Sequence, residues 1–174
     1  QAYSGLMSTT GHVGTPPTRV GGAVVDYGTG MWTAIAVLAA LRKRDQTGEG
    51  SQVDTALLDT SLAWVSNHLT GYMATGVVPG PMGSGVPAIA PYEAFPTSDG
   101  HVMISAGNDV LFARLCTALD VEELTKDPRF LTNPLRSMHH DDLIPLVEER
   151  TRVLTTAQLL EVGRKHQVPC SAIH

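Results

Sequence analysis

A single carboxylate, Asp26, stands at the start of the longest apolar segment of the chain, and this placement most constrains the fold. It follows a short β-branched run and precedes Gly28 and Gly30. We expect Val20 to Val25 to be a short strand or an extended lead-in, and Gly30 to Arg44 to be a helix. That helix has almost no polar face, so we expect it to be buried on most sides.

A strand-to-helix turn can hold a side chain out of the scaffold toward a substrate, and glycines let another molecule approach the backbone. Asp26 is therefore a candidate nucleophile or base. The alternative is a structural role, in which Asp26, Gly28 or Thr29 serves only as the N-cap of the helix. The local sequence leaves both readings open.

Composition narrows the class of protein. Of the 174 residues 43% are hydrophobic and only 17% are charged, so we expect a sizeable core and a surface partly covered by other protein. The net charge of -5 argues against nucleic-acid binding. The run from 31 to 41 is the longest apolar one and predicts a buried helix, so we expect no membrane partner. The chain starts at Gln1 and ends after an apolar run, which suggests a segment of a longer protein.

The two cysteines, Cys116 and Cys170, lie far apart without CxxC spacing. This usage is typical of reduced core residues in a cytoplasmic protein, although the sequence does not exclude a disulfide. Neither cysteine has a basic or histidine neighbour that would make it reactive. His139, His140 and the two aspartates after them are adjacent on an expected helix and diverge in direction, so we expect no metal site.

Turn signals divide the chain into two domains. Residues 1–76 form a first domain, with a short strand at 52–55 and a helix at 56–75 whose apolar residues recur every three or four positions. Residues 77–90 are rich in proline and glycine and predict a linker or mobile loop. Residues 91–174 form a small second domain.

The second domain opens with a predicted hairpin, Tyr92 to Thr97 and His101 to Ser105, joined through an Asp-Gly turn. Asn108 or Asp109 is expected to cap the next helix. Further helices are predicted at 141–151 and 156–166, the latter with a capping box of Thr155 and Gln158. Residues 167–173 are expected to be a strand or a linker. The α/β class follows for the whole chain.

Ordered sequence blocks lie along nearly the whole chain. The blocks of the first domain are Gln1-Ala2-Tyr3-Ser4-Gly5-Leu6-Met7-Ser8, Val25-Asp26-Tyr27-Gly28-Thr29-Gly30-Met31, Thr47-Gly48-Glu49-Gly50 and Leu57-Leu58-Asp59. Those of the second are Pro91-Tyr92-Glu93-Ala94-Phe95, Gly107-Asn108-Asp109 and Asp127-Pro128-Arg129-Phe130. In this order the blocks resemble the family III CoA-transferases, the group that includes formyl-CoA and carnitine-type CoA-transferases.

The resemblance implies a fold in which residues 1–76 are part of a Rossmann-like large domain and residues 91–174 are a small α+β domain. It implies that Asp26 is the nucleophile and that Gly83, Ser84 and Gly85 belong to a glycine loop that covers the site. The substrates would be an acyl-CoA thioester and an organic acid, with no permanently bound cofactor and no metal. Most CoA contacts would lie before Gln1, and two chains would form an interlocked homodimer.

Two alternatives remain at this stage. The related α-methylacyl-CoA racemases use the same aspartate for proton transfer at the α-carbon, and the second active-site position that separates the two groups falls before Gln1. Alternatively, residues 1–174 alone form a non-catalytic segment that folds or dimerises, and we expect them to be inactive in isolation.

Overall fold

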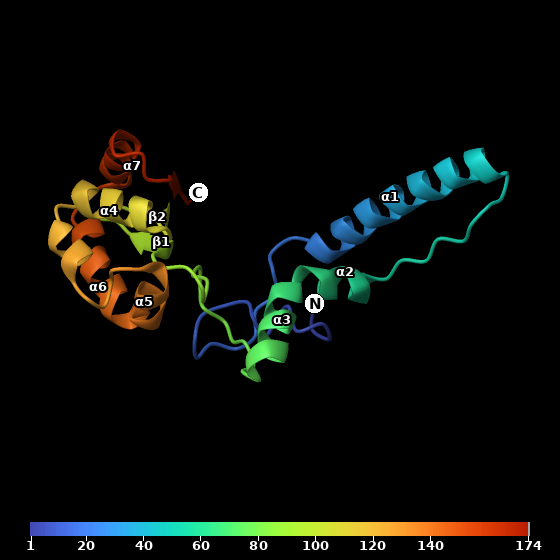
Figure 1. Ribbon diagram of the computed structural model, residues 1–174, viewed down its shortest axis with the longest axis horizontal. Coiled ribbons are helices and arrows are strands. Elements are labelled where there is room, and N and C mark those ends of the chain that lie inside the picture. The colour runs from blue at the N-terminus through green and yellow to red at the C-terminus, as the bar shows by residue number, and fades with distance from the viewer. Residues whose placement is uncertain (174) are drawn as a thin grey trace. The chain divides into compact units, whose positions relative to one another are not determined.

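The computed structural model describes residues 1–173, which divide into two compact units. The first unit covers Gln1–Gly83 and the second begins at Ser84 (Figure 1). The division falls inside the segment 77–90 that the sequence predicts as a linker.

Three helices form the first unit. They are α1 (Val24–Thr47), α2 (Leu57–Trp64) and α3 (Ser66–Thr75). After α1 the chain returns to α2 as an extended segment (Figure 1). The strand predicted at 52–55 is wrong, as is the strand alternative for residues 20–25, because residues 1–83 contain no strand; residues 20–23 are a non-helical lead-in to α1. Val24 and Val25 join α1 instead, and the segment 52–55 has no neighbouring strand to pair with.

The single helix predicted at 56–75 is also wrong, since the chain breaks at Val65 between α2 and α3. Val65 has φ -96° and ψ 14°, outside the helical region, and its side chain is buried. β-Branched residues fit a helix less well than unbranched ones. The three- and four-residue apolar spacing continues across this break, so the pattern alone does not reveal it.

The expected burial of the first helix is not found in the described residues. Only Val25 and Gly28 of α1 are buried, whereas Met31 is 68% and Leu38 67% exposed. The reason is that α1 packs mainly against the short helix α2 within its unit. The 24-residue helix is long and apolar enough to cross a membrane by length and composition, a test that core helices of soluble proteins also pass.

The second unit is built on a three-stranded antiparallel sheet in the order β1-β2-β3. The strands are β1 (Tyr92–Pro96), β2 (His101–Ser105) and β3 (Cys170–Ala172). This confirms the predicted hairpin, in which Phe95 pairs with Val102 and the Thr97 N–H donates to the Gly100 carbonyl at 2.9 Å. Residues 167–173 were expected to be a strand or a linker, and β3 shows that they contain a strand.

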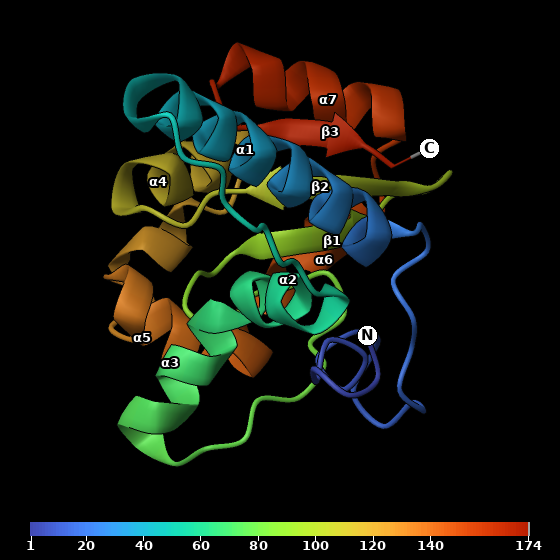
Figure 2. The ribbon, with the colours of Figure 1, turned by 90° about the vertical axis from the view of Figure 1, so that its right-hand side faces the viewer.

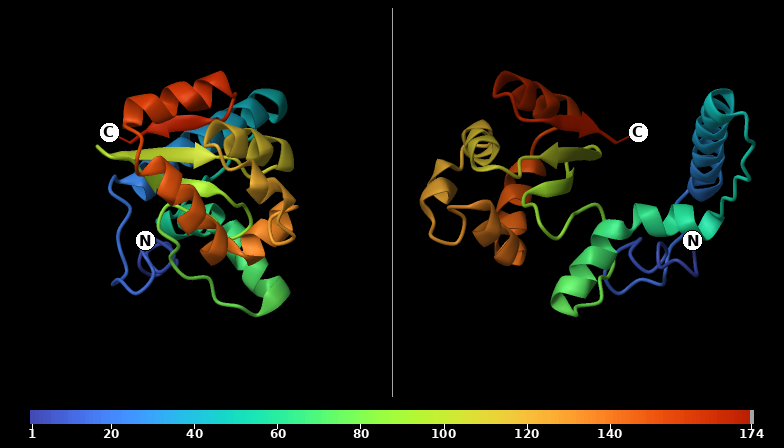
Figure 3. Two further views of the ribbon diagram at one scale, coloured as in Figure 1. Left: turned by 90° about the vertical axis from the view of Figure 1, so that its left-hand side faces the viewer. Right: turned by 45° about the vertical axis from the view of Figure 1, so that its right-hand side comes forward.

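Helices cover this sheet (Figure 2 and Figure 3). They are α4 (Asp109–Ala118), the 3-10 helix η1 (Glu122–Lys126), α5 (Asn133–Met138), α6 (His140–Thr151) and α7 (Thr156–Lys165). Side chains of the sheet and of these helices share one core, which includes Phe95, Val102, Ile104, Phe112, Phe130 and Leu143.

Both helix caps predicted here are confirmed. The Asn108 side chain accepts from the Leu111 N–H at 2.8 Å, and Thr155 and Gln158 form the capping box of α7. Each cap satisfies helix N–H groups that lack an intrahelical partner. The sequence did not predict α5 or η1, which are only 6 and 5 residues long.

Candidate functional site

Asp26 is the third residue of α1 and its side chain is exposed. It therefore lies in the first helical turn rather than at a strand-to-helix turn, because the helix begins two residues before it. Val25 and Gly28, three positions apart, form the buried face of this turn. Asp26 lies off that face, so the packing of its neighbours holds it on the surface.

The capping role considered for Asp26, Gly28 and Thr29 is wrong. The N-cap of α1 is Ala23, and no side chain caps the helix. Within residues 1–173 the Asp26 carboxylate takes part in no hydrogen bond or ion pair. The N–H groups of the first turn have no intrahelical acceptor and favour negative charge nearby. The carboxylate is thus accessible at the N-terminal end of the helix.

The backbone of this turn lies close to α2 because residue 28 is a glycine. A Cβ at Gly28 would overlap the Trp64 ring atom Cζ2, and would lie 2.5 Å from Cη2 of the same ring and 3.2 Å from Thr60 Cγ2. Any side chain at residue 28 would therefore displace the Trp64 ring or push α1 away from α2. The glycine two residues after Asp26 has a packing role that sequence pattern alone did not reveal.

Hydroxyl groups join the two helices next to this contact. Thr29 Oγ1 donates to the Val25 carbonyl at 2.7 Å and to Thr60 Oγ1 at 2.9 Å. One turn further, Thr33 and Thr55 hydroxyls lie 2.9 Å apart. These bonds, with the Gly28 contact, fix the first two turns of α1 and hence the position of Asp26.

The predicted glycine loop is held at Gly83 within the first unit. Gly83 has φ +65°, and its N–H donates to the Gly11 carbonyl at 2.7 Å. A Cβ at Gly83 would lie 2.9 Å from His12 Nδ1. The residue therefore requires glycine both for its backbone conformation and for space.

Ser84 and Gly85 follow in the second unit. The Ser84 hydroxyl accepts from the Ala94 N–H at 2.8 Å, which ties the loop to β1. Gly85 is half-buried and its φ is not in the left-handed region. Within the first unit, as far as the structure describes it, no hydrogen bond or ion pair joins Asp26 to Gly83.

The histidine and aspartate run is divided between two sets of ion pairs. His139 Nδ1 lies 3.1 Å from Asp142, while His140 Nε2 lies 2.6 Å from Glu93 on β1. Burial lowers the pKa of His140, but the hydrogen bonds that its ring donates to the Asp141 and Glu93 carboxylates, and the charges of these carboxylates, outweigh burial and raise the pKa above its ordinary value. Among residues 1–173 no three His, Cys, Asp or Glu side chains gather as metal ligands.

Both cysteines are free, and burial raises the pKa of each thiol, that of Cys116 to about 12. Thiolate is the reactive form, so these residues are poor nucleophiles at neutral pH.

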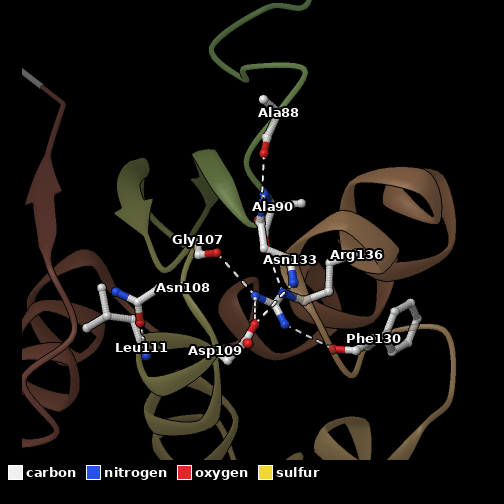
Figure 4. Close-up of polar contacts among 9 residues, drawn as sticks. All are labelled: Ala88, Ala90, Gly107, Asn108, Asp109, Leu111, Phe130, Asn133 and Arg136. Carbon is white, nitrogen blue, oxygen red and sulfur yellow. Dashed lines mark hydrogen bonds and ion pairs between the residues drawn. The ribbon is translucent and has the colours of Figure 1, made fainter.

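A polar cluster that the sequence did not predict lies in the second unit (Figure 4). Its central members are Asn133 and Arg136 on α5, and they bind the backbone on the C-terminal side of the glycine loop. A short helix without clear apolar periodicity gave no signal of this role. A pocket of about 520 Å³ next to the cluster is lined by Ile89, Asn108, Asn133 and Pro134, among others.

Comparison with known proteins gives a consistent result. The profile of CoA-transferase family III matches residues 1–174. The chain is 35% identical to the succinate–glutarate CoA-transferase of Agrobacterium fabrum, over 100% of this chain and 44% of that protein. It is 36% identical to the acetyl-CoA:oxalate CoA-transferase of Acetobacter aceti, over 97% of this chain and 44% of that protein.

A solved structure agrees with these relatives. The fold matches the crystal structure of a CaiB/BaiF family protein from Brucella suis with a TM-score of 0.80 and 38% identity, over 100% of this chain and 46% of that one. The match confirms the expected α/β fold class. The chain thus spans about half the length of the relatives it matches, and it belongs to CoA-transferase family III.

Proposed function

We propose that the complete protein moves CoA between an acyl-CoA thioester and a carboxylic acid, with Asp26 as the nucleophile. The observation that carries the proposal is the free, exposed carboxylate at the N-terminal end of α1, on a turn fixed by Gly28 and Thr29. The two relatives named above are CoA-transferases for small dicarboxylic acids. An organic acid is therefore the proposed acceptor class.

The reaction proceeds in four balanced steps. The Asp26 carboxylate attacks the thioester carbonyl, the C–S bond breaks, and CoA leaves as thiolate while a mixed anhydride forms. The thiolate attacks the Asp26 carbonyl of that anhydride and expels the donor acid, which leaves an Asp26–CoA thioester. The acceptor carboxylate attacks the carbonyl of this thioester and releases CoA thiolate, which leaves a mixed anhydride of Asp26 and the acceptor. The thiolate then attacks the acceptor carbonyl of that anhydride, which forms the new acyl-CoA and frees the Asp26 carboxylate. Each difficult exchange is divided into easier covalent steps.

The N-terminal end of α1 supports this chemistry electrostatically. Its first-turn N–H groups and helix dipole favour negative charge. Negative charge is present on the attacking carboxylate and develops on the carbonyl oxygen in each addition step. The same helix end therefore favours the oxyanions formed on it.

The glycine loop provides the proposed cover. Both the anhydride and the enzyme thioester are hydrolysed by water, so water must be excluded while they exist. A loop of Gly83, Ser84 and Gly85 suits a lid, since glycine residues allow a change of backbone conformation.

We also propose an interlocked homodimer in a reducing, cytoplasmic compartment. The exposed apolar face of α1, with Met31, Ile35 and Leu38, supports a covering by further protein. The free thiols of Cys116 and Cys170 support the compartment. Light scattering of the complete protein measures the dimer directly, and a monomer at micromolar concentration would contradict it.

The test of the nucleophile is Asp26→Asn in the complete protein. We expect the transfer rate to fall on the order of 10³-fold or more, since the amide does not attack a thioester. We expect the stability to change by less than about 1 kcal/mol, because Asp26 is exposed and has no side-chain partner in residues 1–173. The measurements are steady-state CoA transfer and thermal unfolding.

Asp59→Asn is the matched control. Asp59 is also the exposed third residue of a helix, α2, so its substitution removes the same kind of helix-end charge. We expect this variant to keep transfer activity. Transfer by Asp26→Asn at the wild-type rate, or an equal loss in both variants, would refute the assignment.

A further inference from the structure

We propose that Asn133 and Arg136 are positioning residues that hold the C-terminal stem of the glycine loop, residues 88–90, and thereby keep water from the covalent intermediates. The inference rests on the proposed function, because the loop matters only if Asp26 carries such intermediates. The stem, the two residues and every contact named here lie in the second unit.

Asn133 binds the backbone on both sides of Ile89. Its Nδ2 donates to the Ala88 carbonyl at 2.8 Å, and its Oδ1 accepts from the Ala90 N–H at 3.1 Å. One side-chain amide thus satisfies a donor and an acceptor of the stem, as a neighbouring strand would. The Asn133 N–H in turn donates to Asp109 Oδ1 at 3.1 Å, which fixes the start of α5.

Arg136 binds the same stem from the interior of the second unit. Its side chain is fully buried, and Nε donates to the Ala90 carbonyl at 2.9 Å. Nη1 donates to the Phe130 carbonyl at 3.0 Å, and Nη2 donates to the Gly107 carbonyl at 3.1 Å and to Asp109 at 2.8 Å (Figure 4).

A buried guanidinium is costly to desolvate, and apolar residues of similar volume often stabilise a fold as well or better. What an apolar residue cannot do is bind the carbonyls of Ala90, Gly107 and Phe130 together. The Arg136 contacts therefore fix the stem relative to two other loops, which is a geometric role rather than a gain in burial.

Ile89 supplies a third contact. A Cβ at Gly107 would overlap Cγ2 of Ile89, so the Ile89 side chain lies directly over the Gly107 backbone. Gly107 is held by Arg136 at its carbonyl and leaves space for Ile89 at its α-carbon. The stem is consequently fixed through its backbone at residues 88 and 90 and through its side chain at residue 89.

The loop is therefore short between its fixed points. Ser84 is bound to Ala94, and the stem is bound from residue 88 onward. A lid with fixed ends returns to one closed position, whereas a loose stem lets water reach the anhydride or the thioester. Loss of the stem contacts should raise hydrolysis relative to transfer more than it lowers CoA binding.

The test is Asn133→Ala in the complete protein, with Gly107→Ala as a second variant that displaces the same stem through Ile89. We expect the ratio of acyl-CoA hydrolysis to CoA transfer to rise about tenfold, with KM for acyl-CoA changed less than about twofold. Hydrogen exchange followed by mass spectrometry should show the Ala90 amide of Asn133→Ala exchanging about fivefold faster or more, because its acceptor is removed.

Thr155→Ala is the control for loss of stability alone. It removes a cap of α7 in the same unit, at a typical cost of about 1 kcal/mol, without touching the stem. We expect it to leave the hydrolysis-to-transfer ratio unchanged. An unchanged ratio in Asn133→Ala, or an equal rise in Thr155→Ala, would overturn the positioning role. A wild-type protein that transfers no CoA would instead refute the proposed function. The exchange rate of the Ala90 amide would still show whether Asn133 holds residues 88–90.

Discussion

Gly28→Ala tests whether the contact between α1 and Trp64 fixes the helix that carries Asp26. The added Cβ would overlap Trp64 Cζ2 and lie 2.5 Å from Cη2, well inside van der Waals contact. Overpacking of this kind costs about 1–3 kcal/mol. Replacing glycine by alanine inside a helix gains about 0.5–1 kcal/mol. Trp64 is 42% exposed and its ring has room to shift, so we expect a net loss of about 1–2 kcal/mol.

The assay is urea unfolding of the complete protein followed by far-UV circular dichroism, which reports on helix content with or without the Trp64 ring. Gly30→Ala is the matched control, because a Cβ there meets nothing within 4 Å in the described residues and Gly30 lies on the same helix. We expect this control to be as stable as wild type or more stable by up to about 1 kcal/mol. A shift of the Asp26 turn should also lower CoA transfer in Gly28→Ala only.

Equal stability of the Gly28→Ala and Gly30→Ala variants would refute the reasoning. A stronger version combines Gly28→Ala with Trp64→Leu. If the overlap with the ring causes the loss, the double variant should be more stable than the sum of the single changes predicts, with a coupling of about 1 kcal/mol.

Two further predictions concern titration and thiol reactivity. Because the pKa of His140 is raised in the folded protein, its contacts with Asp141 and Glu93 stabilise the fold at pH values below the ordinary histidine pKa, and this stabilisation is lost as the pH rises through the folded-state pKa. Between pH 5 and 8 the unfolding temperature of the wild type should therefore fall more steeply than that of His140→Gln. Parallel plots of unfolding temperature against pH for the two proteins would contradict this prediction. Burial raises the pKa of Cys116 to about 12, so its thiol should react with an aromatic disulfide reagent at pH 8 only after unfolding, and rapid labelling of the native protein would contradict this.

The sequence predicted the second unit well, because its signals are local. An Asp-Gly turn between alternating runs specified the hairpin, and Asn108, Thr155 and Gln158 specified helix starts through side chains that bond to nearby N–H groups. These interactions form within a few residues. The short helices η1 and α5 lacked such signals, since their positions depend on tertiary contacts such as those of Arg136.

The first unit was predicted less accurately for a physical reason. β-Branched residues at 24 and 25 suggested a strand, but these valines form the start of α1, where tertiary packing against α2 outweighs their intrinsic preference. The break at Val65 lies within an unbroken apolar pattern. The exposure of most of α1 was not predicted, because an apolar composition indicates a buried helix without showing which surface would bury it.

In the candidate site, too, features with a local sequence signal were predicted, and features that depend on long-range contacts were not. Asp26 was predicted as a site residue from its setting beside two glycines, and this stays a prediction; the structure explains Gly28 through Trp64, which is 36 positions away in the chain. The hydrogen bonds of Asn133 and Arg136 with residues 88–90 join segments that are more than 40 positions apart in the chain. No local pattern encodes such contacts, so a sequence read on its own does not reveal them.

The most direct test of the account is to incubate the complete protein with candidate acyl-CoAs in heavy water, quench the reaction, and measure the masses of the Asp26 peptide and of the substrate. The account predicts a CoA or acyl adduct on the peptide that carries Asp26, and no adduct in Asp26→Asn. Deuterium at the α-carbon of the substrate with Asp26 unmodified would contradict it and would indicate proton transfer instead.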